Sequence, residues 1–511
     1  MKQAGSSLAS SLLADDENAN EATPSPSVRN DRNDGTKGIS GNPTNPIAGA
    51  AYAPLEVDDE LPFAAAEAGN DASTTPFSHG TSSFNEGVFN MTNTIVGAGI
   101  IGLPYALREA GCWAGIAALV TMAALTDFSL RMLMRTAIQQ RVTTYEALVQ
   151  AALGRSGFTI VCIARFLFSG GAMLAYLLIL GDTVTSVIAS SASDNTAANS
   201  IDSDALRRYA ILGASLLLVL PLCLLRDITH LSKTSLLSIM TVGVMEMVVL
   251  AQLPNAAKFF NSSCAVGIDD GTCTHTFVVG GERGNPSVLE PAGFFPALAI
   301  FAFAFTCHDS SFIIISSFKK PTYQQWCRTT HISIAIATAL CLLMALPGYL
   351  TFRAKTDPNL LNNYPNDDSV MTFVRALYAL TMVLTYPMCF NVCRSVLNVV
   401  FYGTAAESQI TMPLRRHLLL TLPLFFVALF LALIVKELGL VLELTGAVGA
   451  TAVAFVLPAV SLLRLSSSAS TGMVLPGSRA ERRRAWALMI FGTIMGLTAA
   501  AQAIAKAGGT N

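Results

Sequence analysis

Apolar residues gather into eleven runs along the chain, most of them separated by short polar connections. Each run is close to the length of about twenty residues that an α-helix needs to cross a bilayer. We therefore expect an all-α polytopic membrane protein with eleven transmembrane helices. The expected spans are 84–106, 112–137, 158–188, 208–225, 233–253, 293–317, 331–351, 371–400, 417–435, 439–463 and 485–505.

The first span is unusually polar for a membrane helix. From Phe89 to Ala106 it reads FNMTNTIVGAGIIGLPYA, with two asparagines, two threonines, three glycines and a proline. In lipid, every backbone amide and carbonyl needs an internal partner, so a break at Gly97-Ala98-Gly99 is tolerable only where it faces protein, water or a ligand. Broken helices of this kind hold substrates and ions in secondary transporters. The alternative is that the glycines only allow close helix packing.

The composition is that of a membrane protein, and the charge distribution distinguishes the amino-terminal segment from the rest of the chain. The 511 residues are 52% hydrophobic and 13% charged, with a mean hydropathy of +0.51, which excludes a soluble globular protein of this length. Residues 1–80 carry twelve acids and four bases, whereas the whole chain has a net charge of −2, so the remainder carries +6. We expect 1–80 to be a disordered cytoplasmic tail without a signal peptide, and 81–511 to be the transmembrane domain.

Two of the ten cysteines differ from the others, which lie in or beside apolar spans. Cys264 and Cys273 belong to the one long polar loop, which also contains the sequon Asn261-Ser262-Ser263. A glycosylation acceptor near two spaced cysteines suggests an oxidising, non-cytosolic face and a Cys264–Cys273 disulfide. The alternative is two free thiols on a flexible loop.

The distribution of Lys and Arg predicts the orientation. With a cytoplasmic amino terminus, the inner connections hold seventeen basic residues and the outer side holds nine. The inner set is Arg131, Arg135, Arg141, Arg155, Arg226, Lys233, Lys319, Lys320, Arg328, Arg394, Arg415, Arg416, Arg464, Arg479, Arg482, Arg483 and Arg484. This orientation also places the Cys264 loop outside.

The spans suggest two groups of five plus one. Residues 84–253 and 293–463 would form two five-helix repeats of opposite orientation, followed by the eleventh helix at 485–505, because an odd number of spans inverts the second group. Span 6 supports this division. It carries the segment FAFTCHD, from Phe303 to Asp309, at membrane depth, so the first span of each half is the interrupted one.

Polar side chains in spans 1 and 8 are candidates for an ion site. Asn90, Asn93 and Gly97 share one helical face, where amide or carbonyl oxygens could replace part of a cation's hydration shell. In span 8, Thr381 and Thr385 lie four residues apart and could complete the site. Each threonine could equally return a hydrogen bond to a carbonyl one turn earlier.

Other ionisable residues and motifs narrow the class of protein. Arg165, Glu246, Arg375 and Glu443 lie within spans, where proton carriage and structural pairing both remain open. His308 is a further candidate for a proton-sensitive group. The chain contains no nucleophile elbow, phosphate loop, HExxH or zinc-spaced CxxC pair, so we expect neither an enzyme nor a nucleic-acid partner.

Four ordered motifs resemble one known family. They are the span 1 segment quoted above, FAFTCHDSSFIIISSFKKPT from Phe303, LTYP from Leu384 to Pro387, and VLELTGAVGA from Val441. Over roughly residues 84–463 the chain is similar to the amino acid/auxin permease family, which includes the sodium-coupled neutral amino acid transporters and the vacuolar amino acid transporters. The branch of the eleventh sodium-coupled member is the most similar one.

The resemblance implies a leucine-transporter-like fold, with five plus five inverted spans and one more. It also implies site residues. Na⁺ would be the coupling ion, bound by Asn93, the Val96 carbonyl, Thr381 and Thr385. The residues implied for substrate binding are Thr94, Gly97, Ala98, Gly99, Phe303, Phe305 and Thr306.

The function that the resemblance implies is secondary active transport of small, neutral amino acids, coupled to a sodium or proton gradient. A nutrient sensor that binds an amino acid and signals through residues 1–80 is the alternative. The expected partners are the amino acid and the bilayer, which could be vacuolar, lysosomal or plasma membrane.

Overall fold

The computed structural model describes residues 76–77, 80–191, 203–225, 234–255, 287–403, 412–466 and 479–508. In these ranges the regular elements are helices, apart from one isolated bridge between Ser82 and Phe318. Ten helical segments are long and apolar enough to cross a membrane. The prediction of an all-α polytopic membrane protein is confirmed, whereas the number eleven stays a prediction. Residues 1–75 of the acidic tail, Cys264, Cys273 and Asn261 lie outside the described residues.

The helices follow the predicted spans, with several of them divided. In chain order they are α1 (Phe84–Ile95), η1 (Ala98–Gly102), α2 (Leu103–Ala110), α3 (Cys112–Gln139), α4 (Tyr145–Ser191), α5 (Ser203–Ala214), η3 (Ser215–Val219), α6 (Leu220–Leu224), α7 (Thr234–Gln252), α8 (Phe294–Phe305), α9 (His308–Ser317), α10 (Tyr323–Phe352), η6 (Arg353–Lys355), η7 (Leu360–Asn363), α11 (Ser369–Tyr402), α12 (Leu414–Ile434), α13 (Leu438–Leu444), η8 (Thr445–Ala450), η9 (Ala452–Val456), α14 (Leu457–Leu465) and α15 (Arg479–Gly508).

The first predicted span consists of three short helices, α1, η1 and α2, none of which is long enough to cross a membrane alone. A capping box starts α1: the Ser83 amide donates to Glu86 Oε2 at 2.7 Å, and the Glu86 amide donates to Ser83 Oγ at 3.4 Å. The helix ends at Val96, and Gly97 has φ −91° and ψ −140°. The predicted break therefore lies at Gly97.

The sixth predicted span is broken as well. Helix α8 ends at Phe305, Thr306 has the extended angles φ −76° and ψ 111°, and α9 starts at His308. The break falls inside the FAFTCHD segment. Both interruptions therefore fall in the first span of each predicted five-helix repeat, while the repeats themselves stay a prediction.

Helix α4 begins well before the predicted span 158–188. Gly154 divides it with φ 67° and ψ −153°, a backbone conformation that glycine adopts without steric cost. No heavy atom lies within 4 Å of the position that a Cβ at Gly154 would take. The stretch before this kink carries Glu146, and the long part after it carries Arg165.

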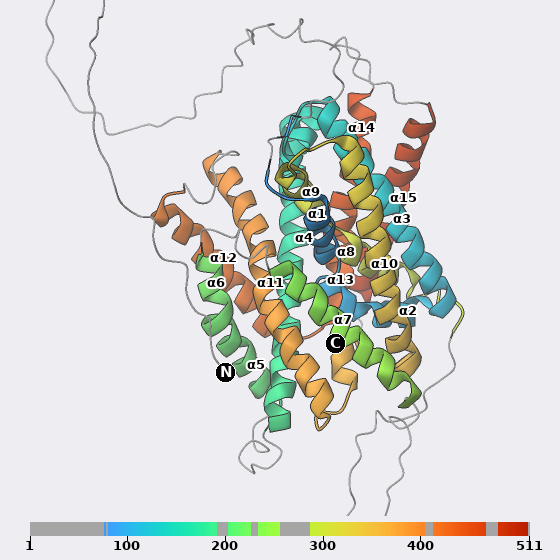
Figure 1. Ribbon diagram of the computed structural model, residues 1–511, viewed down its shortest axis with the longest axis vertical. Helices are drawn as coiled ribbons and strands as arrows, with labels where there is room; N and C mark the ends of the chain where they lie inside the picture. The colour runs from blue at the N-terminus through green and yellow to red at the C-terminus, as the bar shows by residue number, and fades with distance from the viewer. Residues whose placement is uncertain are drawn as a thin grey trace, which may run out of the picture. The chain divides into compact units, whose positions relative to one another are not determined.

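The helices pack in two groups (Figure 1). In the first group, α10 packs against α1, α2 and α3, while α8 packs against α2 and α3, and α1 against α9. In the second group, α4 packs against α5, α11 and α12. Helix α7 contacts α10 and α11, and η8 contacts both α8 and α4, so these elements connect the groups.

Two ends of this bundle are defined by backbone hydrogen bonds. At the Phe84 end, where α1 starts and α9 ends, the Ser82 amide donates to the Ser317 carbonyl at 2.8 Å. At the Ala110 end, where α2 ends and α8 starts, the Glu290 amide donates to the Ala110 carbonyl at 2.9 Å. The positive-inside rule assigns the Phe84 end to the cytoplasm, an assignment that stays a prediction.

Gly446 allows a close approach between η8 and α8. A Cβ at this residue of η8 would lie 1.9 Å from the backbone oxygen of Ala299 in α8. Neither helix can relieve such an overlap by a side-chain rotation. The π-helical η8 and the broken α8 therefore depend on this glycine for their contact.

We predict that Gly446→Ala lowers the stability of the protein by about 1–3 kcal/mol, because the added methyl forces α8 and η8 apart. Thermal unfolding of the purified protein in detergent measures the change. Gly213→Ala in α5 is the matched control, since no heavy atom lies within 4 Å of its Cβ position. An equal effect of the two substitutions would show that helix propensity, and not the close approach, determines the result.

Candidate functional site

A cavity lies where the breaks in the first and sixth predicted spans meet α4 and α11. The centre of a water molecule can occupy about 80 Å³ of this cavity, which is several times the ~10–15 Å³ that one water molecule needs. We call it the central cavity. Its walls are Asn93, Thr94, Ile95, Gly97, Gly99, Phe168, Ala172, Tyr176, Phe303, Ala304, Thr306, Asp309, Ser310, Thr385, Met388, Cys389 and Val392.

Asn93 contributes an unsatisfied acceptor to this cavity. Its side chain is 5% exposed in the last turn of α1, and Oδ1 has no hydrogen-bond partner among the described residues. A buried acceptor without a partner costs about 1–3 kcal/mol. The neighbouring Thr94 differs, because its hydroxyl donates to the Asn90 carbonyl at 2.9 Å. Asn93 Oδ1 is thus suited to a cation or an ammonium group.

Val96 and Ala98 stand at the break of α1, next to residues that line the cavity, but neither is itself a lining residue. The Val96 amide closes the helix by donating to the Thr92 carbonyl at 2.9 Å, while the Val96 side chain is buried outside the lining. The last carbonyls of a helix lack partners within it, as do the first amides of the next helix. Val96 therefore stands at the carboxyl end of α1, where carbonyl groups lack partners. Ala98 stands at the amino end of η1, where amide groups lack partners.

The glycines of this break are needed for packing as well as for the cavity. A Cβ at Gly97 would lie 2.8 Å from the hydroxyl of Tyr176, the tip of a side chain that can move. A Cβ at Gly99 would lie 2.8 Å from the backbone Cα of Ala304 in α8. The functional and packing interpretations of these glycines are therefore not exclusive.

The segment from Phe303 to Thr306 contributes only in part. Phe303 lines the cavity and packs against Phe168, with ring centroids 5.9 Å apart. Thr306 also lines it, and its hydroxyl donates to the Ala302 carbonyl at 2.6 Å. Phe305 is fully buried and does not line it, because residues two apart point to different sides of a helix.

The two threonines of α11 also differ. Thr385 lines the cavity and donates its hydroxyl to the Thr381 carbonyl at 2.6 Å, while Thr381 donates to the Leu377 carbonyl at 3.2 Å and lies outside the lining. Both threonines thus make the return hydrogen bonds expected of such residues. A hydroxyl that donates its proton keeps its acceptor lone pairs, so the Thr385 oxygen can still ligate a cation.

The cavity includes residues that we did not single out in the sequence. Phe168, Ala172 and Tyr176 come from a part of α4 that is apolar except for Ser169-Gly170-Gly171, and we did not interpret this stretch as part of a site. Asp309 is a different case, because an acidic residue at membrane depth was visible in the sequence. It is 7% exposed, and the Ser169 hydroxyl lies 3.5 Å from its Oδ2.

Ionisable residues away from the cavity mostly have structural partners. Arg165 pairs with Glu146, and Arg375 donates to the carbonyls of Leu361 and Tyr364 at 2.8 and 2.7 Å. Glu246 on α7 differs, because it is fully buried and neither carboxyl oxygen has a hydrogen-bond partner among the described residues. Within those residues, no group of three His, Cys, Asp or Glu side chains could hold a metal ion.

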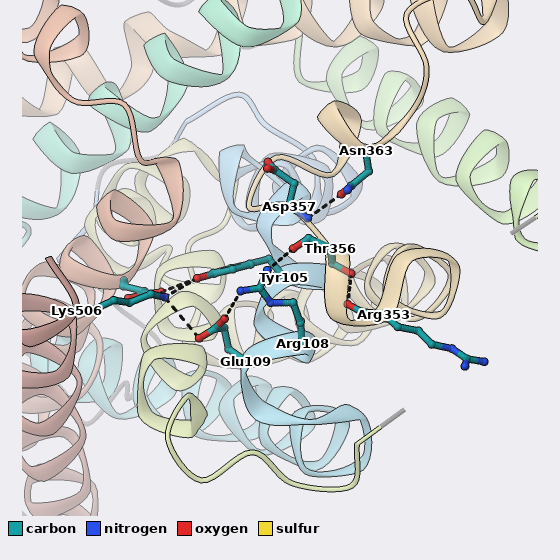
Figure 2. A network of polar contacts seen from close by, with 9 residues as sticks. Tyr105, Arg108, Glu109, Arg353, Thr356, Asp357, Asn363 and Lys506 are labelled. Atoms are coloured by element: carbon teal, nitrogen blue, oxygen red, sulfur yellow. Dashed lines mark hydrogen bonds and ion pairs between the residues drawn. The ribbon is translucent and has the colours of Figure 1, made fainter. Parts of the chain in front are cut away.

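Polar contacts join several elements at the Ala110 end of the bundle (Figure 2). Lys506 of α15 donates to the Tyr105 hydroxyl at 2.8 Å and lies 3.3 Å from Glu443 and 3.6 Å from Glu109. Arg108 connects this cluster to the connection after α10 by donating to the Thr356 carbonyl at 2.8 Å.

Asp357 belongs to the same connection, between α10 and α11. Its amide donates to Asn363 Oδ1 at 2.7 Å, and burial raises the pKa of its carboxyl. Contacts among α2, α13, α15 and the connection between α10 and α11 therefore stabilise the Ala110 end. Asp309 lies in the first turn of α9, the half of its span that leads to the other end.

The arrangement of helices has counterparts among solved structures. A manganese transporter from Eremococcus coleocola, in complex with an aromatic bis-isothiourea substituted compound, superposes with a TM-score of 0.54 over 86% of this chain and 92% of its own. The two sequences are 14% identical, so the likeness shows the fold alone. It agrees with the leucine-transporter-like fold that the resemblance to the family implies.

Sequence comparison identifies the family. A family model described as "Transmembrane amino acid transporter protein" matches residues 80–506. A rat protein (Rattus norvegicus) named "Putative sodium-coupled neutral amino acid transporter 11" is 32% identical over 77% of this chain and 80% of its own length. Vacuolar amino acid transporter 2 of Saccharomyces cerevisiae is 26% identical over 76% of this chain and 77% of its own. The chain belongs to the transmembrane amino acid transporter family.

Proposed function

We propose that this protein carries small neutral amino acids across a membrane by alternating access, driven by a sodium or proton gradient. One observation carries the proposal: both broken helices open onto one small cavity, where Asn93 Oδ1 is buried without a partner. The names of the relatives agree with an amino acid substrate.

The amino acid would lie against the two breaks. Amides at the start of η1, from Ala98 and Gly99, suit its carboxylate, because the amino end of a helix favours negative charge. Thr94, Gly97 and Thr306 would complete a polar wall, with Phe303 on the opposite side. The cavity volume favours a small side chain. Phe305 would support Phe303 from the core and not touch the substrate.

The coupling ion would bind between α1 and α11. Asn93 and Thr385 offer oxygens on the cavity, and the Val96 carbonyl lies at the carboxyl end of α1. Thr381, one turn away, would act through its carbonyl, which accepts the Thr385 hydroxyl and so orients it. Na⁺ prefers oxygen ligands of this kind. In a proton-coupled cycle, a titrating group in the same cavity would carry the proton in place of the ion.

The state of the bundle fits one half of an alternating-access cycle. Asp309 lines the central cavity and also a second cavity toward the Phe84 end, while the contacts around Lys506 join α2, α13 and α15 at the Ala110 end. Transport would require these contacts to break and the Phe84 end to close. We also propose a cytoplasmic amino terminus and the two five-helix repeats 84–253 and 293–463. The proposed location is a vacuolar, lysosomal or plasma membrane.

Uptake by the full chain in reconstituted vesicles tests the proposal. Sodium and pH gradients are imposed separately, and uptake of the standard amino acids is measured. We expect small neutral amino acids to accumulate under one of the two gradients. Failure of every standard amino acid to accumulate under either gradient would contradict the proposal.

We predict that Thr385→Ala weakens the apparent affinity for the coupling cation by about ten- to a hundredfold, because one ligand worth roughly 1.5–3 kcal/mol is lost. Uptake as a function of cation concentration measures this, with protein abundance as a second readout. Thr338→Ala on α10 is the control, since Thr338 makes the same return bond, at 2.6 Å to Ile334. Unchanged cation dependence in Thr385→Ala would remove α11 from the ion site.

We also predict that Gly97→Ala lowers uptake by about tenfold at normal abundance, because the new methyl displaces the Tyr176 hydroxyl inside the cavity. The double variant Gly97→Ala/Tyr176→Phe removes that hydroxyl and should recover part of the uptake. Gly99→Val should abolish transport, but it also disturbs packing on Ala304. Normal uptake by Gly97→Ala would leave these glycines with a packing role alone.

A further inference from the structure

A second cavity lies between the central cavity and the Phe84 end of the bundle. About 500 Å³ of it is open to the centres of water-sized spheres, and it shares Asp309 with the central cavity. We call it the Arg165 cavity. Its lining residues from α4, α9 and α11 include Glu146, Arg165, Asp309, Phe312 and Ser395. A substrate that leaves the central cavity past Asp309 enters this second one.

Arg165 has donors to spare in this cavity. The residue is 8% exposed, one guanidinium nitrogen pairs with Glu146 across the kink at Gly154, and Nε has no hydrogen-bond partner among the described residues. A guanidinium presents five N–H donors in a planar fork. Burying it is costly unless those donors are satisfied. The fork suits the carboxylate of a ligand, which it can bind through two parallel hydrogen bonds.

The same cavity also presents negative charge. Asp309 is 7% exposed and lies in the first turn of α9, where its carboxylate accepts from the backbone amides of Asp309 and Ser310 and lies 3.5 Å from the Ser169 hydroxyl. Its carboxylate can accept from an ammonium group. The Arg165 cavity thus carries a cation and an anion on facing helices, which matches the two charges of an α-amino acid.

We infer that the Arg165 cavity is a second binding site for a zwitterionic amino acid, with its carboxylate on the free donors of Arg165 and its ammonium group on Asp309. The inference rests on the proposed transport function and adds a stopping point on the route between the central cavity and the Phe84 end. The alternative is that Arg165 only neutralises Glu146 and Asp309.

Binding stoichiometry separates these two roles. The probe is radiolabelled L-alanine, measured by equilibrium dialysis on the purified full chain in detergent, with uptake of the same amino acid measured in vesicles. The double variant Arg165→Gln/Glu146→Gln leaves neither partner of the pair as a lone buried charge. We expect it to bind roughly half as much alanine at saturation as the unchanged protein. Glu146→Gln alone keeps the guanidinium and should bind the full amount.

Arg165→Lys protects the test against a folding defect, because lysine can still pair with Glu146 but lacks the planar fork. We expect this variant to weaken the second binding event by about tenfold while its thermal unfolding stays near that of the unchanged protein. Full stoichiometry and affinity in both Arg165 variants would overturn the inference. So would saturation of the unchanged protein at a single alanine per chain while it still transports alanine. Absence of both uptake and binding in the unchanged protein would overturn the proposed function itself.

Discussion

The architecture depends on the need of every backbone amide and carbonyl inside a membrane for a partner. Two helices break this regularity, at Gly97 and at Thr306, and each break lies where other helices surround it. Gly99 against Ala304 and Gly446 against Ala299 bring the neighbouring backbones close enough to exclude lipid. The groups freed at the breaks therefore face either packed protein or the central cavity. The central cavity and the interrupted backbone are thus two aspects of the same arrangement.

The sequence predicted the breaks because their residues are unlike their surroundings. Asparagines and glycines in span 1, and an acidic residue in span 6, are conspicuous within apolar runs. The wall that α4 provides was not predictable in this way. Phe168 and Tyr176 belong to an apolar stretch in which residues facing lipid, core and cavity look alike. Their role depends on which helices pack around α4, and that information is not local.

Resemblance to the family names residues by segment, and the structure places members of one segment differently. It named Phe303 and Phe305 together, and Thr381 and Thr385 together, yet only one residue of each pair lines the cavity. The helical period separates Phe303 from Phe305, while a full turn toward the Ala110 end separates Thr381 from Thr385. A segment-level match therefore names a helix and leaves the direction of each side chain to the structure.

The three-piece construction of the first span affects topology. In the described part of the chain, ten helices are long and apolar enough to cross a membrane. Helices α1, η1 and α2 are each too short to be among them. An even number of crossings would put both chain ends on one side of the membrane, and an odd number would put them on opposite sides. The short helices around Gly97 thus decide the sidedness of every connection that follows, including the loop that carries Cys264 and Cys273.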